Sequence, residues 1–345
     1  MANQQLSVVV EKQRTEATIG ALRTEGIYDD SRSVYECGSE TVAIPVTQPP
    51  QSTDVIETVE ETGEPRLRTL ADHLRTRGWS ETDLEQAPGS WAVIGSVVLV
   101  DVGDSPRPAE VGEALLAMHG QADTVLARGD ISGPHREPDV TVIAGEGDTE
   151  TVHREHGTVY ALDLADVMFS PGNKSERARM KGVVDEGERV LDMFAGIGYF
   201  TLPMARGGAQ VTAVERNPTS FQYLVENVVR NGVTERVETY RADCRDVVSG
   251  GLSGADPDQP FVFDRIVMGY YDAYEYLDSA LAVVGEDAIV HMHEATPEGL
   301  VPDRPVDRLR EAAADHGQTV EVLDVRRVKG YSEGVAHVVV DARIS

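Results

Sequence analysis

A glycine-rich turn flanked by acidic strand ends is the part of this sequence best suited to chemistry. In the run RVLDMFAGIGYFTLP, Gly196 and Gly198 follow a predicted strand, where glycine lets the backbone turn tightly beside a ligand. The next two predicted strands end at Glu215 and Asp243. Because the carboxyl ends of parallel strands share one edge of a sheet, these residues predict a ligand site there, with Glu215 accepting hydrogen bonds from ribose hydroxyls.

The ligand that suits this edge is S-adenosylmethionine. Tyr199, Phe200 and Thr201 follow Gly198, so the third glycine of a dinucleotide-binding Gly-x-Gly-x-x-Gly motif is missing. Asp192, at the end of the first strand, would repel a pyrophosphate but suits a sulfonium that carries a free amino group. A nicotinamide cofactor is one alternative. A degenerate site, in which the glycines make only an ordinary tight turn, is the other.

The elements that position this edge follow two smaller blocks. From about residue 166, strands and helices alternate, which predicts a doubly wound parallel sheet covered by helices on both faces. A Pro-, Thr- and Glu-rich stretch before the second block predicts a linker. The expected organisation is a small N-terminal α/β domain at 1–46, a linker at 47–66, an α+β middle domain at 67–165 and a catalytic domain at 166–345.

The amino-acid composition indicates the environment in which the protein works. The 345 residues carry a net charge of -28, from 59 acidic and 31 basic side chains, and only four of the basic ones are lysines. Such a surface indicates a halophilic source, where molar salt screens repulsion beyond about 3 Å. A mesophilic protein with a basic partner is the alternative. Cys37 and Cys244 are too few for a disulfide framework or a structural zinc site. With no leader-like start and no long apolar run, we expect a cytoplasmic protein without a membrane partner.

Several motifs together resemble one group of tRNA-modifying enzymes. The motifs are MFSPGNKSERARM, VLDMFAGIGYFTLP, AVERNP, YRAD, DRIVMGY, HMHEATPE and VKGYSEGVAHVVVD. They are similar to those of the archaeal and eukaryotic guanine-37 N1-methyltransferases and of the aminocarboxypropyltransferases of wybutosine biosynthesis. The resemblance covers residues 85–345 well and 5–46 more loosely. It implies a class I adenosylmethionine-dependent methyltransferase fold, Rossmann-like with a seven-stranded sheet, preceded by small α+β domains. It also suggests that residues 1–46 touch the tRNA elbow.

Two departures separate the branches of this group. The methyltransferase branch has an arginine after FSP and an Asn-Leu-Pro-like motif after the fourth strand, whereas this chain has Gly172-Asn173 and Met268-Gly269-Tyr270. Both resemble the aminocarboxypropyl branch. The implied reaction transfers the 3-amino-3-carboxypropyl group of adenosylmethionine to carbon 7 of 4-demethylwyosine at position 37 of tRNA-Phe, releasing methylthioadenosine. N1-methylation of guanine 37 is the alternative, and a tRNA-binding protein without catalysis is a third hypothesis.

The resemblance also implies the cofactor contacts. Arg177 is expected to hold the methionine carboxylate bidentately, unless it is only an exposed helix charge. Asp243 is expected to accept from the adenine amino group, beside the backbone amide of Cys244, and Asp192 to act on the cofactor amine through water. The predicted cofactor-binding set is Ser170, Arg177, Asp192, Phe194, Gly196, Gly198, Glu215, Asp243 and Cys244.

The catalytic group is not assigned by the sequence. Asn173, Tyr270 and Tyr271 are the candidates, and either tyrosine is expected to stack on the flipped base or else to be a core aromatic. His291 and His293 lie on one face of a predicted strand, but without an evident third ligand we expect no metal.

Contacts with tRNA are expected from local basic clusters, because the chain as a whole is acidic. Scattered solvated charge is the alternative for each cluster. We expect the protein to act as a monomer. The clusters are Lys174, Arg177, Arg179 and Lys181; Arg326, Arg327 and Lys329; and Arg128, His135, Arg136, His153 and Arg154.

Overall fold

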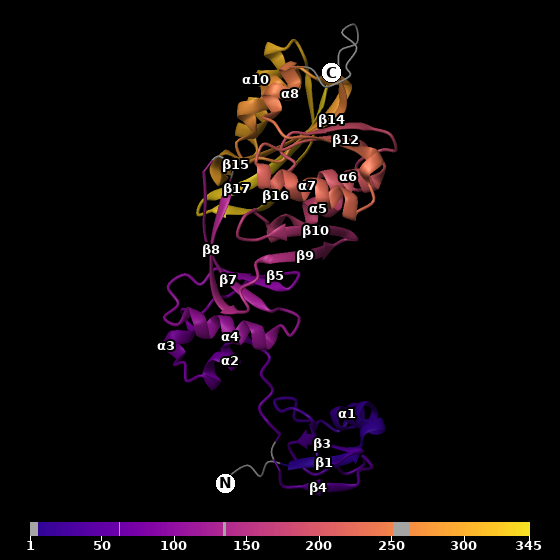
Figure 1. The fold of residues 1–345 in the computed structure, drawn as a ribbon. Coiled ribbons are helices and arrows are strands. Elements are labelled where there is room, and N and C mark those ends of the chain that lie inside the picture. Colours follow the sequence, from indigo (N-terminus) through magenta and orange to yellow (C-terminus); the bar gives the residue numbers. More distant parts are fainter. Residues whose placement is uncertain (1–5, 62, 134–135, 251–261) are drawn as a thin grey trace. The chain divides into compact units, whose positions relative to one another are not determined.

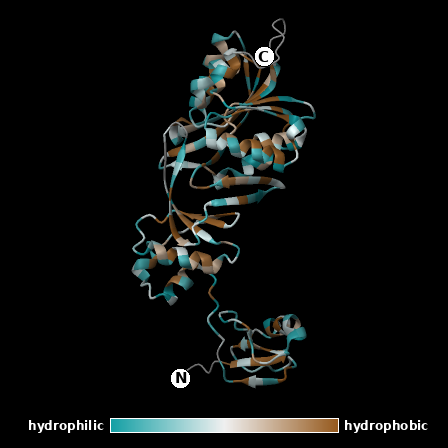
Figure 2. Cartoon of the chain, in the orientation of Figure 1, coloured by the Kyte–Doolittle hydropathy of each residue, from teal (hydrophilic) through white to brown (hydrophobic). Residues whose placement is uncertain are grey.

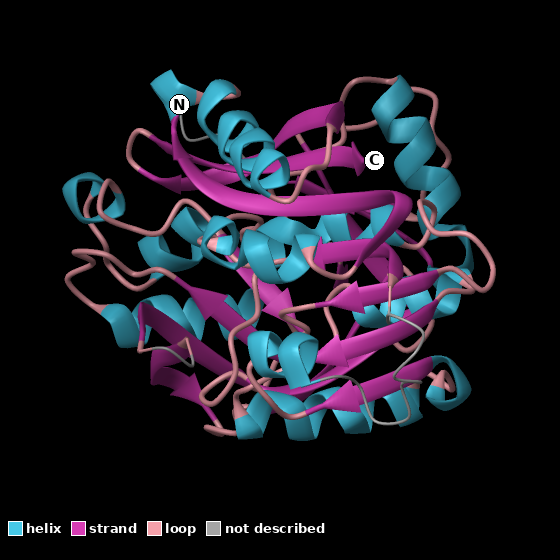
Figure 3. Ribbon diagram, turned by 90° about the horizontal axis from the view of Figure 1, so that it is seen from above, coloured by secondary structure: helices cyan, strands magenta, loops and turns pink. Residues whose placement is uncertain are grey.

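The computed structural model describes residues 6–61, 63–133, 136–250 and 262–345. The chain divides into two compact units, Met1–Leu84 and Glu85–Ser345. Figure 3 colours the elements by type, with the strands in magenta lying among helices in cyan. Figure 2 shows hydrophobic residues, in brown, gathered on the strands and polar residues, in teal, on loops and helix surfaces.

The first unit is built on a four-stranded antiparallel sheet in the order β2-β3-β1-β4. Its core joins Val8 and Val10 of β1, Ile44 and Val46 of β3, and Leu22 of α1, all of them buried. The elements are β1 (Leu6–Glu11), η1 (Lys12–Arg14), α1 (Thr15–Thr24), β2 (Tyr35–Glu36), β3 (Thr41–Val46), β4 (Glu57–Val59), α2 (Leu70–Thr76) and α3 (Glu81–Leu84).

The segment predicted as a linker, 47–66, differs from expectation. It contributes β4, which pairs with β1 and closes one edge of the sheet. The Glu25 carboxylate also accepts hydrogen bonds from the backbone amides of Gln51 and Ser52, at 2.9 and 3.2 Å. Because β4 is only three residues long and mostly exposed, it carries no run of apolar residues that would distinguish it from a linker.

The second unit contains a seven-stranded sheet in the order β13-β12-β11-β14-β15-β17-β16. Figure 1 labels β12, β14, β15, β16 and β17 of this sheet. The first five strands are parallel, and β17 runs antiparallel to both of its neighbours. The doubly wound, seven-stranded prediction is therefore confirmed. The strands are β11 (Arg189–Asp192), β12 (Gln210–Val214), β13 (Val237–Tyr240), β14 (Phe263–Met268), β15 (Val284–Pro297), β16 (Val320–Ser332) and β17 (Val335–Ile344).

Helices cover both faces of this sheet, because successive strand residues point to opposite sides. Val190 packs into a core with α5, α6 and α7, whereas Leu191 packs into a second core with α8, α9 and α10. The helical elements are η2 (Pro171–Asn173), α5 (Lys174–Met180), α6 (Thr201–Gly207), α7 (Pro218–Arg230), η3 (Thr234–Arg236), α8 (Cys244–Gly250), η4 (Ala273–Tyr276), α9 (Leu277–Leu281), η5 (Glu298–Leu300) and α10 (Asp303–Asp315).

A smaller mixed sheet and a hairpin precede the seven-stranded sheet within the same unit. The sheet has the order β5-β6-β7-β8, and β9 pairs only with β10. The elements are β5 (Trp91–Ile94), β6 (Val97–Val100), α4 (Pro108–Met118), β7 (Thr124–Ser132), β8 (Glu137–Gly145), β9 (Glu150–Glu155) and β10 (Thr158–Asp163).

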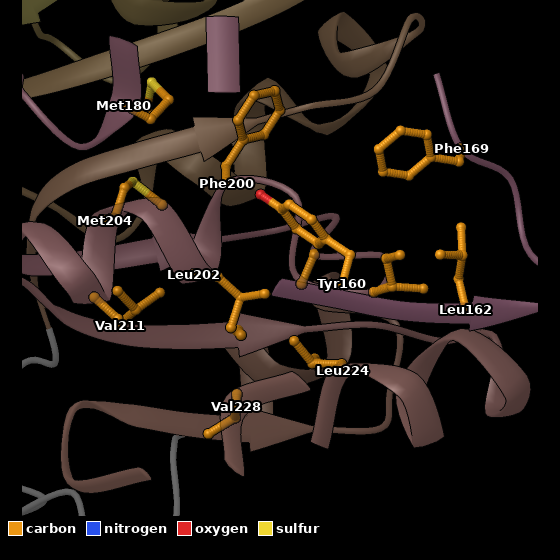
Figure 4. Packing of buried hydrophobic residues seen from close by; sticks show 14 of the residues in the cluster. Tyr160, Leu162, Phe169, Met180, Phe200, Leu202, Met204, Val211, Leu224 and Val228 are labelled. Carbon is orange, nitrogen blue, oxygen red and sulfur yellow. The ribbon is translucent and has the colours of Figure 1, made fainter. Parts of the chain in front are cut away.

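The predicted boundary at 165/166 is not a division between compact units. Tyr160 and Leu162 of β10 lie in one core cluster with Leu202 of α6 and Leu224 of α7 (Figure 4). The same cluster reaches Leu126 of β7. Residues 85–345 therefore form one compact unit with a continuous apolar core, and the division into a middle and a catalytic domain stays a prediction.

Two asparagines of α7 bond to the backbone of β10. The amide of Asn227 accepts from the Ala161 N–H at 2.7 Å and donates to the Ala161 carbonyl at 3.0 Å. Asn231 does the same with Val159, at 2.9 and 2.7 Å. These four bonds fix the hairpin on the helix that follows the second strand of the catalytic sheet.

Candidate active site

A cavity opens where the carboxyl ends of β11, β12, β13 and β14 meet, the edge predicted from the sequence. All three catalytic candidates and most of the predicted cofactor residues line it. The predicted residues on its wall are Ser170, Asn173, Arg177, Phe194, Gly196, Glu215, Asp243, Cys244, Tyr270 and Tyr271. Asp192 and Gly198 are not among the lining residues.

The two glycines of the turn have different roles. Gly196 has a φ of +57°, and a Cβ there would lie 2.4 Å from the Tyr199 ring, so only glycine fits. Gly198, at φ +102°, faces Leu202 and Leu224 instead, at 2.8 and 3.3 Å from a Cβ. Its missing side chain makes room for Leu202 and Leu224, and its contact with the cofactor stays a prediction.

Glu215 joins the end of β12 to the glycine turn. One carboxylate oxygen accepts from the Gly196 amide at 2.8 Å and the other from the Asn217 amide at 2.6 Å. Burial raises the pKa of Glu215 from its usual value, opposed by these amide bonds. Each carboxylate oxygen has further acceptor capacity, and the residue lines the cavity, so a pair of hydroxyls can be bound here.

The end of β13 carries a second carboxylate. Asp243 accepts from Nε and Nη2 of Arg245, at 2.9 and 2.8 Å, and the bond to Arg245 holds its pKa below the usual range. Asp243 is thus an anionic acceptor at the wall of the cavity. Burial raises the pKa of the Cys244 thiol to about 12, so this thiol stays protonated and is not a nucleophile.

Asp192 lies beneath the turn and does not reach the cavity. It is fully buried, and its carboxylate accepts from the Thr201 hydroxyl at 2.7 Å and from the Phe194 amide at 3.4 Å. Burial raises its pKa to about 6. Asp192 ties the end of β11 to the start of α6, and its water-mediated contact with the cofactor stays a prediction.

Arg177 also differs from its prediction. It is 2% exposed, so it is not a solvated helix charge, and its Nε and Nη2 donate to the Glu155 carboxylate at 2.8 and 2.9 Å. Its Nη1 donates to the Ser170 carbonyl at 2.8 Å. The bidentate face of the guanidinium is therefore occupied by the protein itself, although the residue still lines the cavity.

Aromatic rings form the wall opposite the acidic strand ends. Phe194 packs against Tyr270 and edge-on against Tyr276, with ring centroids 5.2 and 5.0 Å apart. Tyr271 stands edge-on to His337 at 4.9 Å. Both Tyr270 and Tyr271 are half-buried and line the cavity, and Tyr270 also packs against the second core, so stacking of either ring on the base stays a prediction.

Two polar residues of the wall, Arg136 and His337, were not assigned to the site from the sequence, and Lys329 bonds to a third wall residue, Ser170. The Lys329 ammonium donates to Ser170 Oγ at 2.5 Å, and burial together with nearby arginines lowers its pKa to about 8. His337 bonds through Nε2 to His293 Nδ1 at 3.0 Å, and its own Nδ1 is buried without a partner in the described structure. Arg136 packs over the Tyr271 ring at 5.2 Å. Lys329 and Arg136 were predicted only as members of basic clusters.

The paired histidines have protein partners. His291 Nδ1 lies 2.6 Å from Asp341, and Arg265 Nη1 lies 2.6 Å from His291 Nε2. Within the described ranges, no group of three or more His, Cys, Asp or Glu side chains is arranged to hold a metal ion.

The predicted basic clusters are only partly available to a nucleic acid. Arg326 is ion-paired with Glu176 and Asp341, Arg179 also with Asp341, and Arg327 with Glu298. Lys174 and Lys181 are exposed. Arg128 pairs with the exposed Asp101 at 3.3 Å, and His135 lies outside the described residues. Over the same described stretches, no helix is both long and apolar enough to cross a membrane.

Comparison with known proteins identifies the family of this chain. Residues 151–323 match the model of the TRM5/TYW2 methyltransferase domain, and residues 70–149 match the TYW2 N-terminal domain. A tRNA(Phe) (4-demethylwyosine(37)-C(7)) aminocarboxypropyltransferase from Pyrococcus horikoshii is 37% identical over 287 residues, 81% of this chain and 96% of that relative. The chain belongs to the TRM5/TYW2 family.

Solved structures from the TRM5/TYW2 family confirm the fold class. TYW2 of Pyrococcus horikoshii, solved in complex with MeSAdo, has a TM-score of 0.67 and 36% identity, covering 79% of this chain and 96% of its own. Trm5b of Pyrococcus abyssi has a TM-score of 0.74 and 29% identity, covering 99% of both chains. The class I methyltransferase fold expected from the sequence is confirmed, and the protein is a transferase of this family.

Proposed function

We propose that this protein transfers the 3-amino-3-carboxypropyl group of S-adenosylmethionine to carbon 7 of 4-demethylwyosine at position 37 of tRNA-Phe. The Pyrococcus horikoshii relative carries this activity in its name. The observation that carries the proposal is the end of β14. Met268 is buried, and the next two positions, Gly269 and Tyr270, line the cavity without the polar pair that activation of a ring nitrogen needs.

The cavity fits adenosylmethionine. Carboxylates stand at two adjacent strand ends, Glu215 for two hydroxyls and Asp243 for an amino group. The third glycine of a dinucleotide-binding motif is missing after Gly198, which disfavours a pyrophosphate ligand. Phe194 lines the same cavity and packs against Tyr270. We propose Ser170, Arg177, Phe194, Gly196, Glu215, Asp243 and Cys244 as the cofactor contacts.

The bound sulfonium makes each carbon attached to it electrophilic, so placement decides which bond breaks. In the overall reaction, ring carbon 7 bonds to the γ-carbon of the amino-acid arm, the bond from that carbon to sulfur breaks to give methylthioadenosine, and carbon 7 loses its proton. Glu215 and Asp243 fix the nucleoside at one end. The other end of the cavity is lined by Tyr271, Asn173 and His337. Two buried atoms there, Asn173 Oδ1 and His337 Nδ1, lack partners among the described atoms.

A labelling experiment tests the group transferred. The protein is incubated with tRNA-Phe bearing 4-demethylwyosine and with adenosylmethionine labelled either in the methyl or in the carboxyl carbon. We expect label in tRNA from the carboxyl donor and release of methylthioadenosine. Label entering only from the methyl donor would sink the proposal.

N1-methylation of guanine 37 is the second candidate. It is favoured by the match to Trm5b, which covers 99% of this chain, including the N-terminal unit, whereas the TYW2 structure covers 79%. The same assay with tRNA that carries unmodified guanine 37 decides between them, because only the methyltransferase activity labels that tRNA from the methyl donor.

We also propose where the enzyme works, its oligomeric state and the part of the tRNA on which it acts. We propose that it acts as a cytoplasmic monomer without a metal on the anticodon loop of tRNA-Phe, and that residues 1–46 contact the tRNA outside that loop. The net charge of -28 supports a halophilic source. Transfer activity that is highest at molar potassium chloride and resists a metal chelator would agree, and an optimum at low salt would exclude the halophilic assignment.

A further inference from the structure

The strand β16 is irregular where it passes the cavity. Gly330 pairs with Ala336 of β17, but Ser332 pairs with Val335, so Tyr331 is an extra residue with no opposite partner. Such a bulge turns one side chain away from the regular alternation of the strand, and bulges are frequent beside active sites. A second register shift, between Arg327 and Lys329, immediately precedes it.

The bulge places an aromatic ring against a residue of the cavity wall. Tyr331 stands edge-on to Tyr271 with ring centroids 4.7 Å apart, and Tyr271 lines the cavity. Yet Tyr331 itself is 48% exposed, and among the described tyrosines it is the one classed as exposed. The hairpin turn behind it is two residues long, with Gly334 at φ +68°, so the ring is presented on a short, fixed support.

The charges around this ring suit a polyanion. Lys329, two residues earlier on β16, and Arg136 both lie near the face of Tyr271, at 6.0 and 5.2 Å from its centre. The polar contacts of the two cations in the described part of the chain are Ser170 Oγ for Lys329 and the Met168 sulfur for Arg136, and neither contact is anionic.

We propose that Tyr331 is a stacking platform for the nucleotide next to the target base. The inference rests on the proposed function, because it requires a tRNA whose base 37 enters the cavity. Extruding one base from a loop leaves the face of its neighbour uncovered. The exposed ring of Tyr331 stacks on that face, and Lys329 and Arg136 bind phosphates of the RNA backbone. Single-stranded RNA is commonly bound in this way.

The test places the fluorescent base 2-aminopurine at position 36 or 38 of tRNA-Phe and titrates the full-length protein. Stacking quenches this base, so the wild type is expected to quench one of the two positions. Tyr331→Ala should remove the quenching and weaken tRNA binding about 5- to 150-fold, the range for loss of one base–aromatic stack. Tyr331→Trp should keep both. Leu323→Ala, at an equally exposed position on the same strand, is the matched control and should change neither.

The outcomes separate this inference from the proposed function. Equal fluorescence for wild type and Tyr331→Ala at both positions overturns the platform, even if the aminocarboxypropyl group is transferred normally. Quenching that depends on Tyr331 supports it, even if the labelling assay shows a methyl transferred instead. Binding of methylthioadenosine should be the same in all four proteins, and a loss confined to Tyr331→Ala would mean that the ring shapes the cofactor site, which also overturns the inference.

Discussion

Arg177 and Glu155 form a buried two-bond ion pair, with Nε and Nη2 of the arginine 2.8 and 2.9 Å from the two carboxylate oxygens. Arg177 is 2% exposed and Glu155 6%. Although burial opposes ionisation, hydrogen bonds from His153 and Arg177 lower the pKa of Glu155 to about 2. The pair links β9 to α5, so the helix that follows the FSPGN turn is anchored to the hairpin.

Arg177→Ala is expected to destabilise the fold by about 3–5 kcal/mol, because it leaves the Glu155 charge buried and unpaired. Guanidinium unfolding followed by circular dichroism measures this. Arg189→Ala, which removes an exposed ion pair with Asp264, is the control and should cost less than about 1 kcal/mol. A similar loss in the two variants would contradict the assigned role of Arg177.

Glu215→Ala is expected to raise the Kd for adenosylmethionine by about tenfold or more, since losing a charged hydrogen-bond partner costs ~1.5–3 kcal/mol. Isothermal titration calorimetry measures the Kd. Glu226→Ala on the exposed side of α7 pairs with Arg230 and serves as the control. An unchanged Kd in Glu215→Ala would remove Glu215 from the ribose role.

Asp192→Asn is expected to change how stability depends on pH. The folded pKa of Asp192, about 6, is above the unfolded value of 3.8, so ionisation opposes folding and the wild type loses stability as pH rises between those values. The loss approaches about 3 kcal/mol. Because the amide that replaces the carboxyl cannot ionise, the unfolding free energy of the variant should rise relative to that of the wild type between about pH 4 and 7. Chemical unfolding at a series of pH values measures this, and parallel profiles would show that Asp192 does not titrate in this range.

Gly196→Ala is expected to lose both stability and cofactor binding, because its Cβ would meet the Tyr199 ring at 2.4 Å in a left-handed backbone. Gly232→Ala is a matched control, with φ +65° and nothing within 4 Å of its Cβ. Both should lose about 1 kcal/mol to backbone strain, but only Gly196→Ala should also fail to bind adenosylmethionine. If the two variants bind it equally well, Tyr199 does not confine the turn.

The cofactor edge was predictable because it depends on local pattern. Each acid follows closely on a short strand, Glu215 directly after β12 and Asp243 three residues after β13, so the local sequence indicates both the element and the edge of the sheet on which the acid lies. Gly196 is recognised in the same way. Asp192 and Gly198 belong to the same short motif, but whether such a residue faces a ligand or the core depends on the rotation of the following helix, which no local pattern encodes.

The contacts that hold the aromatic wall could not be predicted from the sequence, because they join residues that are far apart in the chain. Glu155 meets Arg177 across 22 positions, and His337 meets Tyr271 across 66, only after a hairpin and an antiparallel strand have taken their registers. The extra residue in β16 is likewise invisible in sequence, because a bulge changes pairing without changing composition. The three-residue strand β4 was taken as part of a linker because its residues are mostly exposed.

The side-chain amides of Asn227 and Asn231 reproduce, for β10, the donor and acceptor pattern that a neighbouring strand would offer. A two-stranded ribbon with a bare edge can recruit a strand from another molecule. Because α7 bonds to the backbone groups of Val159 and Ala161, these groups cannot pair with a strand of another molecule. We expect this contact to reduce edge-to-edge aggregation of the protein at high concentration.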